Sequence, residues 1–296
     1  MGTSRRATDH ADHQQEMQVT QSNTCRALPG DLRYVTTEQR EGVLTISLNR
    51  PEKRNAMSVE LTFEMVRLLE AVALDESVRV VVLRGTGPGF CAGMDIGDFF
   101  DLSTRDEVTL RQAKEAANHW RVRLLRNLPQ PTIAMVHGFC FGGAFGIVEA
   151  CDIALAAYDT KFTLSEINFG HFPAGPVAKS ISRTMSARAA SYYSLSGRTF
   201  DGPEAVRTGF ITRSVPAAQL ESETYGLAAE LATKDPIALQ FTKESLQHVE
   251  TMTWDAALNY NAAKFAELKT RQQGAGSRAA SVASFLEGKS RPGLGS

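Results

Sequence analysis

Two adjacent glycines, Gly142 and Gly143, stand in an apolar run that directly follows a strand-like segment at residues 131–138. Glycine weakens a helix interior by roughly 0.5–1 kcal/mol relative to alanine, so a merely buried helix would do better with alanine. At a helix start, however, free backbone N–H groups can bind an anion, and glycine lets a ligand approach them closely. The pair could therefore hold negative charge. Close packing of the helix against a neighbour is the alternative explanation.

A second glycine-rich segment, "RGTGPGFCAGMDI" at residues 84–96, also follows a strand-like run. If both segments present N–H groups to one point, they would form an oxyanion hole, in which two donors stabilise developing negative charge. A dinucleotide fingerprint is not indicated, because "GTGPGF" lacks the third glycine of the GxGxxG pattern. The chain has no GxxxxGK(S/T) sequence, which excludes a P-loop. An ordinary turn is the alternative for this segment.

An acid lies in the apolar segment "FTLSEINFG", where Glu166 follows a short strand-like run. Such an acid is costly unless it has a partner or a function. Burial would raise its pKa toward the range that a general acid or base needs. A structural carboxylate with a hydrogen-bonding partner is the alternative.

Two cations, Lys53 and Arg54, lie in "NRPEKRNAMS", in a loop before an expected helix. They could contact phosphate groups of a ligand. The alternative is a solvated charge pair, which is the usual role of adjacent surface cations.

The spacing of apolar residues predicts an α/β domain followed by a helical region. We expect strands at 32–39, 42–48, 78–85, 131–138, 151–157 and 161–164. We expect helices at 58–75, where Ser58 is the N-cap, at 103–128 and at 142–150. After about residue 175 the chain is expected to be helical, at 186–195, 201–209, 220–234, 236–249 and 253–269.

The composition is that of one large globular domain, with 43% hydrophobic residues and a net charge of −1 from 32 Lys+Arg and 33 Asp+Glu. This balance gives no indication of nucleic-acid binding. No apolar run approaches the ~20 residues that span a bilayer, so we expect no membrane association. The four cysteines form no CxxC pair, which indicates reduced, buried thiols in a cytoplasmic protein rather than disulfides or a metal site. Residues 1–30 are polar and unpatterned, which indicates a disordered tail.

Together, in this order and spacing, the four segments resemble the crotonase (enoyl-CoA hydratase/isomerase) superfamily, over roughly Tyr34 to Pro292. "LNRPEKRNAMS", "AGMD", "PTIAMVHGFCFGG", "ACDIA" and "LSEINFG" resemble most closely the 4-hydroxycinnamoyl-CoA (feruloyl-CoA) hydratase-lyases. The resemblance implies an α/β fold, a crotonase-like spiral of ββα units with a C-terminal helical trimerisation region. The core would span 31–220 and the helical C-terminal region 221–296, and the assembly would be a homotrimer or a dimer of trimers.

The resemblance also implies roles for individual residues. The N–H groups of Met94 and Gly143 would form an oxyanion hole for a thioester carbonyl, and Glu166 matches the catalytic glutamate. The substrate would be an acyl-CoA, with no metal or other cofactor. The positions expected to bind the acyl-CoA are Lys53, Arg54, Ala56, Ala92, Ile96, Phe99, Gly142, Gly146, Ser165, Phe169 and His171.

Several positions depart from the superfamily pattern. The first glutamate of ordinary hydratases would fall at Gly146, where the hydratase-lyases have serine, and we do not expect Glu149, one turn further on, to replace it. Phe99 and Ala262 stand where the hydratase-lyases use two tyrosines. Tyr260 is on a different helix face from position 262 and is interpreted as a packing residue. His171 is a candidate for substrate contact, and a structural role is its alternative.

The function implied is hydration of an aromatic α,β-unsaturated acyl-CoA, followed by retro-aldol cleavage to an aromatic aldehyde and acetyl-CoA. The first alternative is another enoyl-CoA hydratase or a double-bond isomerase, which also needs one glutamate and an oxyanion hole. The second is a non-catalytic acyl-CoA-binding protein. Lys289 or Arg291 could reach CoA phosphates, including those bound to a neighbouring subunit. The alternative is that these surface cations bind nothing specific.

Overall fold

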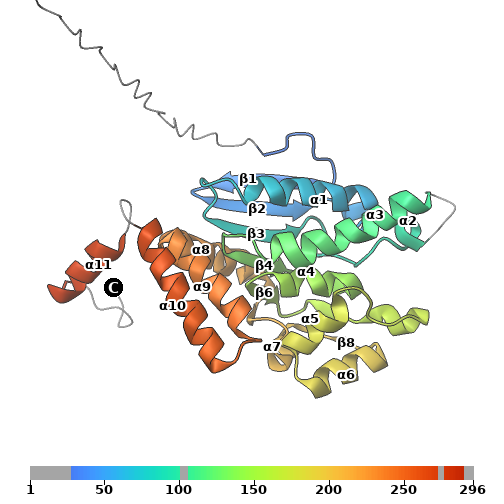
Figure 1. The fold of residues 1–296 in the computed structure, drawn as a ribbon. Coiled ribbons are helices and arrows are strands. Elements are labelled where there is room, and N and C mark those ends of the chain that lie inside the picture. Colours follow the sequence, from blue (N-terminus) through green and yellow to red (C-terminus); the bar gives the residue numbers. More distant parts are fainter. Residues whose placement is uncertain (1–27, 101–105, 273–276, 290–296) are drawn as a thin grey trace, which may run out of the picture.

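The computed structural model describes residues 28–100, 106–272 and 277–289 (Figure 1). The predicted tail at 1–30 falls almost wholly outside these ranges, as do Cys25 and Arg291. The elements follow the order expected from the sequence, with strands and helices first and a run of helices at the end. Within the described ranges, no helix is long and apolar enough to cross a membrane.

A six-stranded sheet forms the centre of the fold, with β1 and β2 antiparallel and the other neighbouring strands parallel. Its strands in spatial order are β1 (Val35–Arg40), β2 (Val43–Leu48), β3 (Val80–Gly85), β4 (Thr132–Val136), β6 (Ile153–Ala157) and β9 (Arg213–Val215). Every residue of β2 and β4 is buried. Such continuous burial is typical of parallel strands that helices cover on both faces. Five of these strands confirm the predictions at 32–39, 42–48, 78–85, 131–138 and 151–157.

A second, three-stranded sheet consists of β5 (Phe139–Phe141), β7 (Lys161–Thr163) and β8 (Thr199–Phe200). β7 confirms the strand predicted at 161–164, whereas the sequence does not predict β5, β8 or β9. The expectation of a wholly helical chain after residue 175 is therefore wrong at β8 and β9. These strands have two or three residues, too few for an apolar alternation, and they form by pairing with neighbours that are already in place.

The predicted helix at 58–75 is confirmed as α1 (Val59–Val72), where the Ser58 hydroxyl accepts a hydrogen bond from the Leu61 amide. The segment after β5 forms a 3-10 helix (Gly142–Ala144) that continues into α4 (Phe145–Ala150). The glycine pair therefore does lie at the start of a helical segment, as the sequence predicts.

The prediction of a single long helix at 103–128 is wrong in detail. The described part consists of α3 (Glu107–Asn118) and a π-helix (His119–Leu125), and residues 103–105 lie outside the described ranges. A π-helix bonds i to i+5, so the side chains that follow are rotated relative to a continuous α-helix. Within the π-helix, Trp120 and the charged Arg121 are both buried.

The remaining helices are α2 (Ile96–Phe100), α5 (Val177–Thr184), α6 (Ala187–Ser196), α7 (Gly202–Thr208), α8 (Leu220–Ala232), α9 (Pro236–Val249), α10 (Trp254–Arg271) and α11 (Ser277–Leu286). α8 packs against β3, β4 and β6 and buries Leu220 and Ala228 there. α9 and α10 pack side by side, with α11 beyond them (Figure 1).

The apolar core lies on both faces of the main sheet. The larger cluster joins the sheet to α1, the π-helix and α4, and the smaller one joins it to α8. Three cysteines are buried and unpaired, Cys91, Cys140 and Cys151. The prediction that the thiols are buried is therefore confirmed for the described cysteines.

Candidate active site

A cavity of about 570 Å³ opens where the loop after β3, the helix pair α3 and π, the 3-10 turn before α4 and the segment after β7 meet. Its walls are Ala92, Gly93, Met94, Ile96, Phe99, Lys114, Ala117, Asn118, Arg121, Gly142, Gly143, Ser165, Glu166, Phe169, His171, Phe172, Ala174, Gly175 and Val177. Three of the four segments identified from the sequence thus meet at one cavity, although they are far apart along the chain.

Ten of the predicted site residues line this cavity: Met94, Gly143, Glu166, Ala92, Ile96, Phe99, Gly142, Ser165, Phe169 and His171. Four others do not, namely Lys53, Arg54, Ala56 and Gly146. The loop at 53–56 instead contacts a lining residue through the backbone, because the Ala92 amide donates to the Arg54 carbonyl at 3.0 Å.

Gly93 allows the two glycine-rich segments to approach each other. It has a φ of +95°, and a Cβ at this position would lie 2.8 Å from the Phe141 carbonyl oxygen and 3.2 Å from the Gly143 nitrogen. The Phe141 amide in turn donates to the Cys91 carbonyl at 3.0 Å. Any larger residue at 93 would force the two backbones apart.

The amides of Met94 and Gly143 come together at this approach, since a Cβ on Gly143 would lie 3.4 Å from the Met94 nitrogen. Gly143 is the second residue of its 3-10 helix, where an amide has no partner within the helix. In the described part of the chain, the Met94 amide donates no hydrogen bond either. The arrangement can present both N–H groups to one oxygen.

Glu166 lies in a 3-10 turn, Ser165–Phe169, with its carboxylate beside the glycine pair. A Cβ on Gly142 would lie 3.2 Å from the Glu166 Oε1 atom. The Oε2 atom is buried and has no hydrogen-bond partner among the described residues. Burial raises the pKa of this carboxyl, and the opposing effects of its own backbone amide and of His171 are smaller. A carboxylate kept free in this way can accept a proton.

His171 and two phenylalanines form the outer wall of the cavity. The His171 amide donates to the Glu166 carbonyl at 3.0 Å, and the imidazole stacks on the Phe172 ring with centroids 5.3 Å apart. Phe169 and Phe172 are 71% and 68% exposed, so large apolar surfaces face solvent at this wall. An apolar, aromatic wall of this kind suits an apolar or aromatic ligand.

The sequence does not predict three polar residues of the cavity wall that α3 and the π-helix form, namely Lys114, Asn118 and Arg121. One signal in the sequence could have identified Arg121. It is a charged residue on the apolar face of its helix, next to the buried Trp120. Which of its neighbours form the cavity depends on tertiary packing, which the sequence pattern does not contain.

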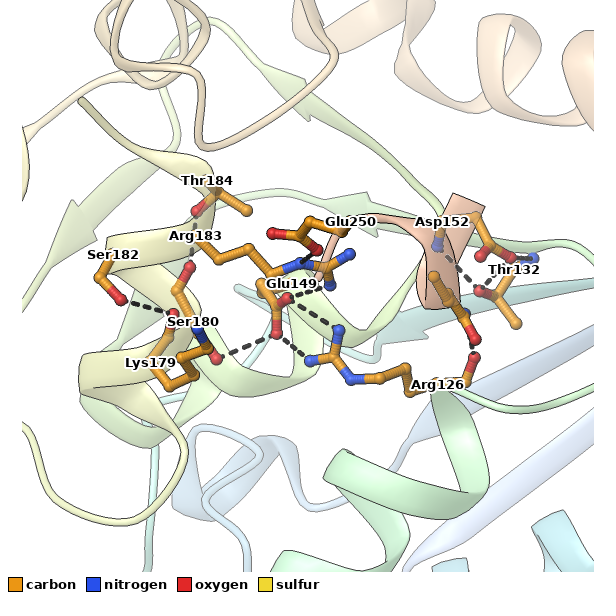
Figure 2. A network of polar contacts seen from close by, with 11 residues as sticks. Arg126, Thr132, Glu149, Asp152, Lys179, Ser180, Ser182, Arg183, Thr184 and Glu250 are labelled. Carbon is orange, nitrogen blue, oxygen red and sulfur yellow. Dashed lines mark hydrogen bonds and ion pairs between the residues drawn. The ribbon is translucent and has the colours of Figure 1, made fainter. Parts of the chain in front are cut away.

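The space around Gly146 is already filled. A Cβ there would lie 3.1 Å from Pro176 Cγ and 3.9 Å from Arg121 Nη1. Glu149 points away from the cavity and binds Arg126, Arg183 and Ser180 (Figure 2). As expected from the sequence, Glu149 does not provide a second carboxylate in the site.

Three other residues that the sequence raises as candidates for the site do not line the cavity. Tyr260 packs against His248, with ring centroids 5.7 Å apart, in agreement with a packing role, and Ala262 is exposed. Lys289 forms an ion pair with Glu287 at 2.7 Å.

Both a family model and individual proteins of known kind match this chain. A family model described as enoyl-CoA hydratase/isomerase matches residues 38–292. A hydroxycinnamoyl-CoA hydratase-lyase of Pseudomonas fluorescens is 38% identical over 267 residues, which cover 90% of this chain and 96% of that protein. The mitochondrial Delta(3,5)-Delta(2,4)-dienoyl-CoA isomerase of Homo sapiens is 30% identical and the match covers 76% of this chain and 71% of that protein.

Solved structures agree with this result. An enoyl-CoA hydratase of Mycobacterium smegmatis superposes with a TM-score of 0.78 at 26% identity, covering 87% of this chain and 98% of that one. AtuE of Pseudomonas aeruginosa also gives a TM-score of 0.78, at 33% identity, and covers 87% of this chain and 98% of its own. These similarities confirm the fold class predicted from the sequence.

Proposed function

The chain belongs to the enoyl-CoA hydratase/isomerase family, and from that membership we propose that it acts on an aromatic α,β-unsaturated acyl-CoA. The proposed reaction adds water across the double bond and then cleaves the product by a retro-aldol step. It yields an aromatic aldehyde and acetyl-CoA. The 38% identity to a hydroxycinnamoyl-CoA hydratase-lyase supports this choice of substrate.

The observation that carries the proposal is the position of the Glu166 carboxylate. It lies beside the glycine pair, has one buried oxygen without a hydrogen-bond partner in the described chain, and is the sole acid among the described residues of the cavity wall. Burial raises the pKa of this group. These are the properties of a general base held ready for a substrate.

The amides of Met94 and Gly143 would bind the thioester oxygen and stabilise the enolate that forms when a nucleophile attacks Cβ. Removal of one such donor in other enzymes costs about 2.7–4 kcal/mol of transition-state stabilisation. The same two donors would serve the enolate released in the second step. A single oxyanion hole can therefore support both reactions.

Glu166 would take a proton from water as the hydroxyl adds to Cβ, and return a proton to Cα of the enolate. In the second step it would take the proton of the new β-hydroxyl. The Cα–Cβ bond then breaks, its electron pair becomes the enolate of acetyl-CoA, and Glu166 returns its proton to Cα to complete the product. Atoms and electrons balance without a redox partner, so the proposal requires no metal or redox cofactor.

We assign the CoA phosphates to Lys53 and Arg54. Both side chains are exposed, and neither forms an ion pair with a described carboxylate. Their loop contacts the segment of Ala92 through the backbone, because the Ala92 amide donates to the Arg54 carbonyl. Ala56 would contribute backbone contact in this loop.

The test is incubation of the pure protein with feruloyl-, 4-coumaroyl-, cinnamoyl- and crotonyl-CoA, followed by mass spectrometry of the products. Free aromatic aldehyde with acetyl-CoA would support the proposal. A β-hydroxyacyl-CoA that accumulates without aldehyde would mean that the retro-aldol step is wrong. Absence of turnover with all four would overturn the proposed substrate class.

A double-bond isomerase is the second candidate, because a single carboxylate and an oxyanion hole suffice for it. The similarity to dienoyl-CoA isomerases favours it specifically. Here Glu166 would move a proton between two carbons of the acyl chain, and no oxygen from water would enter the product. Incubation in H₂¹⁸O separates the candidates, since a hydratase incorporates the label and an isomerase does not.

A further inference from the structure

Arg121 is a buried cation in the cavity wall whose charge is not balanced by a carboxylate. Its exposed fraction is 4%, and within the described residues no acidic side chain lies within ion-pair distance of it. Buried arginines are almost always paired, because an isolated buried charge is costly. Burial accordingly lowers the pKa of Arg121 to about 10.

Two other arginines near this region show how the fold deals with structural cations. Arg126, five residues further on, and Arg183 both bind the buried carboxylate of Glu149 (Figure 2). Neither of them lines the cavity. Arg121 therefore differs from both in two respects, its place in the cavity wall and its lack of an acidic partner.

The guanidinium of Arg121 is held in one orientation by neutral acceptors. Its Nε donates to the Ala117 carbonyl at 2.7 Å, its Nη1 to the Gly143 carbonyl at 3.1 Å and its Nη2 to Asn118 Oδ1 at 3.4 Å. A guanidinium has five N–H donors, and these contacts use three. The other two N–H groups remain for a ligand, and the guanidinium that carries them is already held in one orientation.

Two further donors share this wall. Lys114 and Asn118 are four residues apart on α3, and Arg121 follows in the π-helix. All three line the cavity, and Lys114 and Asn118 are exposed. The wall thus offers an ammonium, an amide and a guanidinium, while Glu166 is assigned to proton transfer in the proposed reaction.

From this arrangement, and resting on the proposed acyl-CoA function, we propose that Arg121 determines specificity by binding an acceptor oxygen on the acyl group, beyond Cβ. The oxygen belongs to a ring hydroxyl or to a carboxylate, both of which accept hydrogen bonds from a guanidinium. Asn118 orients the guanidinium.

The experiment compares two matched pairs of substrates, each with and without the acceptor oxygen. The pairs are 4-coumaroyl-CoA with cinnamoyl-CoA, and glutaconyl-CoA with crotonyl-CoA. We expect kcat/KM of the wild type to favour the oxygen-bearing member of one pair by about 10- to 100-fold, the usual effect of a hydrogen bond to a charged group. The pair that shows the preference identifies the phenol or the carboxylate as the ligand.

In the Arg121→Met variant we expect that preference to fall below about threefold. Methionine keeps an unbranched side chain but has no N–H donors. Arg121→Lys should retain part of the preference. Arg123→Met is the matched control, because Arg123 is an exposed arginine of the same π-helix outside the cavity lining, and it should keep the wild-type ratio. Equal losses for both members of a pair would overturn the proposal and make Arg121 a support for the Gly143 peptide.

Binding measurements separate this inference from the proposed reaction. The saturated analogues 3-(4-hydroxyphenyl)propanoyl-CoA, 3-phenylpropanoyl-CoA, glutaryl-CoA and butanoyl-CoA cannot be hydrated, and calorimetry gives their Kd for the wild type and for the Arg121→Met variant. A wild-type preference for an oxygen-bearing analogue that the Arg121→Met variant loses, without turnover of any substrate, would overturn the proposed function and support the assignment of Arg121. Equal Kd values within each pair would overturn the assignment even if the lyase reaction is observed.

Discussion

Replacing Glu166 by glutamine should separate catalysis from stability. We expect kcat/KM to fall by about 100- to 10,000-fold, the usual contribution of a general acid or base. Because the folded-state pKa of Glu166 is raised, its ionised form destabilises the fold as pH rises through that pKa. The Glu166→Gln variant should therefore have a Tm at pH 8 equal to or above that of the wild type, as measured by calorimetry.

The matched control is Glu52→Gln, since Glu52 is exposed and outside the cavity. It should change neither kcat/KM nor Tm. A Glu166→Gln protein that is much less stable than the wild type would show that the carboxylate has a structural partner, contrary to the free Oε2 atom in the structure.

The charge of His171 should affect the pH dependence of the reaction. Glu166 must be ionised to act as a base, so kcat/KM should rise with pH and level off above its raised pKa. His171 lowers that pKa. In a His171→Ala variant the pKa should be higher, and the acidic limb of the profile should move to higher pH. An unchanged limb would mean that His171 does not act electrostatically on Glu166.

The sequence identifies one part of the cavity much better than the other. Glu166, Gly142 and Gly143 can be recognised because their chemistry is unusual for their local context: an acid in an apolar run and glycines at a helix start. Lys114 and Asn118 have ordinary side chains for an exposed helix. Their role depends on which face of α3 closes the cavity, and that is decided by packing between distant segments.

At the level of elements, the 3-10 turn before α4 should be sensitive to a side chain at Gly142. Its φ of +49° costs an L-residue about 1–2 kcal/mol, and an added Cβ would lie 3.2 Å from Glu166 Oε1. The Gly142→Ala variant should lose about that much stability in urea unfolding and more than about tenfold in kcat/KM, because the carboxylate must move.

Gly288→Ala is the control for backbone strain alone. Gly288 has a φ of +71° and nothing within 4 Å of an added Cβ, and it lies far from the cavity after α11. The Gly288→Ala variant should lose a similar amount of stability without loss of activity. If Gly142→Ala were fully active, the carboxylate position seen beside this turn would not be the one used in catalysis.

The ion-pair network around Glu149 holds α4 to Arg126, directly after the π-helix, and to α5 (Figure 2). The Glu149 side chain is 1% exposed, and its removal leaves two partly buried arginines without their carboxylate. We expect Glu149→Gln to lower the free energy of unfolding by about 3–5 kcal/mol, measured in urea at 25 °C. The kcat of the folded fraction should change little.

Glu250→Gln is the matched control for this network. Glu250 binds Arg183 from the outside and is 48% exposed, so its loss should cost less than about 1 kcal/mol. A Glu149→Gln protein with normal stability and no turnover would mean that Glu149 acts in catalysis, despite its distance from the cavity wall.

The elements that the sequence does not predict are those that depend on neighbours. β9 has three residues and exists because β6 offers an edge, and β5 has three residues between β4 and the glycine turn. The π-helix interrupts a segment whose apolar pattern predicts a continuous helix. By contrast, β2, β3 and α1 are predicted correctly because their own residues contain a continuous apolar run or a helical repeat with a capping serine.

At the level of the whole molecule, α10 is incompletely buried for a helix of 18 residues. None of its residues is buried, and Trp254, Leu258 and Phe265 are 85%, 63% and 46% exposed. Their spacing of four and seven residues places them along one face of the helix. An exposed apolar stripe of this kind marks an interaction surface. The expected homotrimer or dimer of trimers would cover it.

We therefore expect light scattering to give a mass about three or six times the 32.2 kDa of one chain. Leu258→Glu places a charge in the α10 stripe and should reduce that mass, because a buried unpaired charge is costly. Leu74→Glu is the matched control, since Leu74 is also 63% exposed but follows α1. It should leave the mass unchanged. A wild-type mass of one chain would contradict the trimer, and the α10 stripe would then face solvent in the active protein.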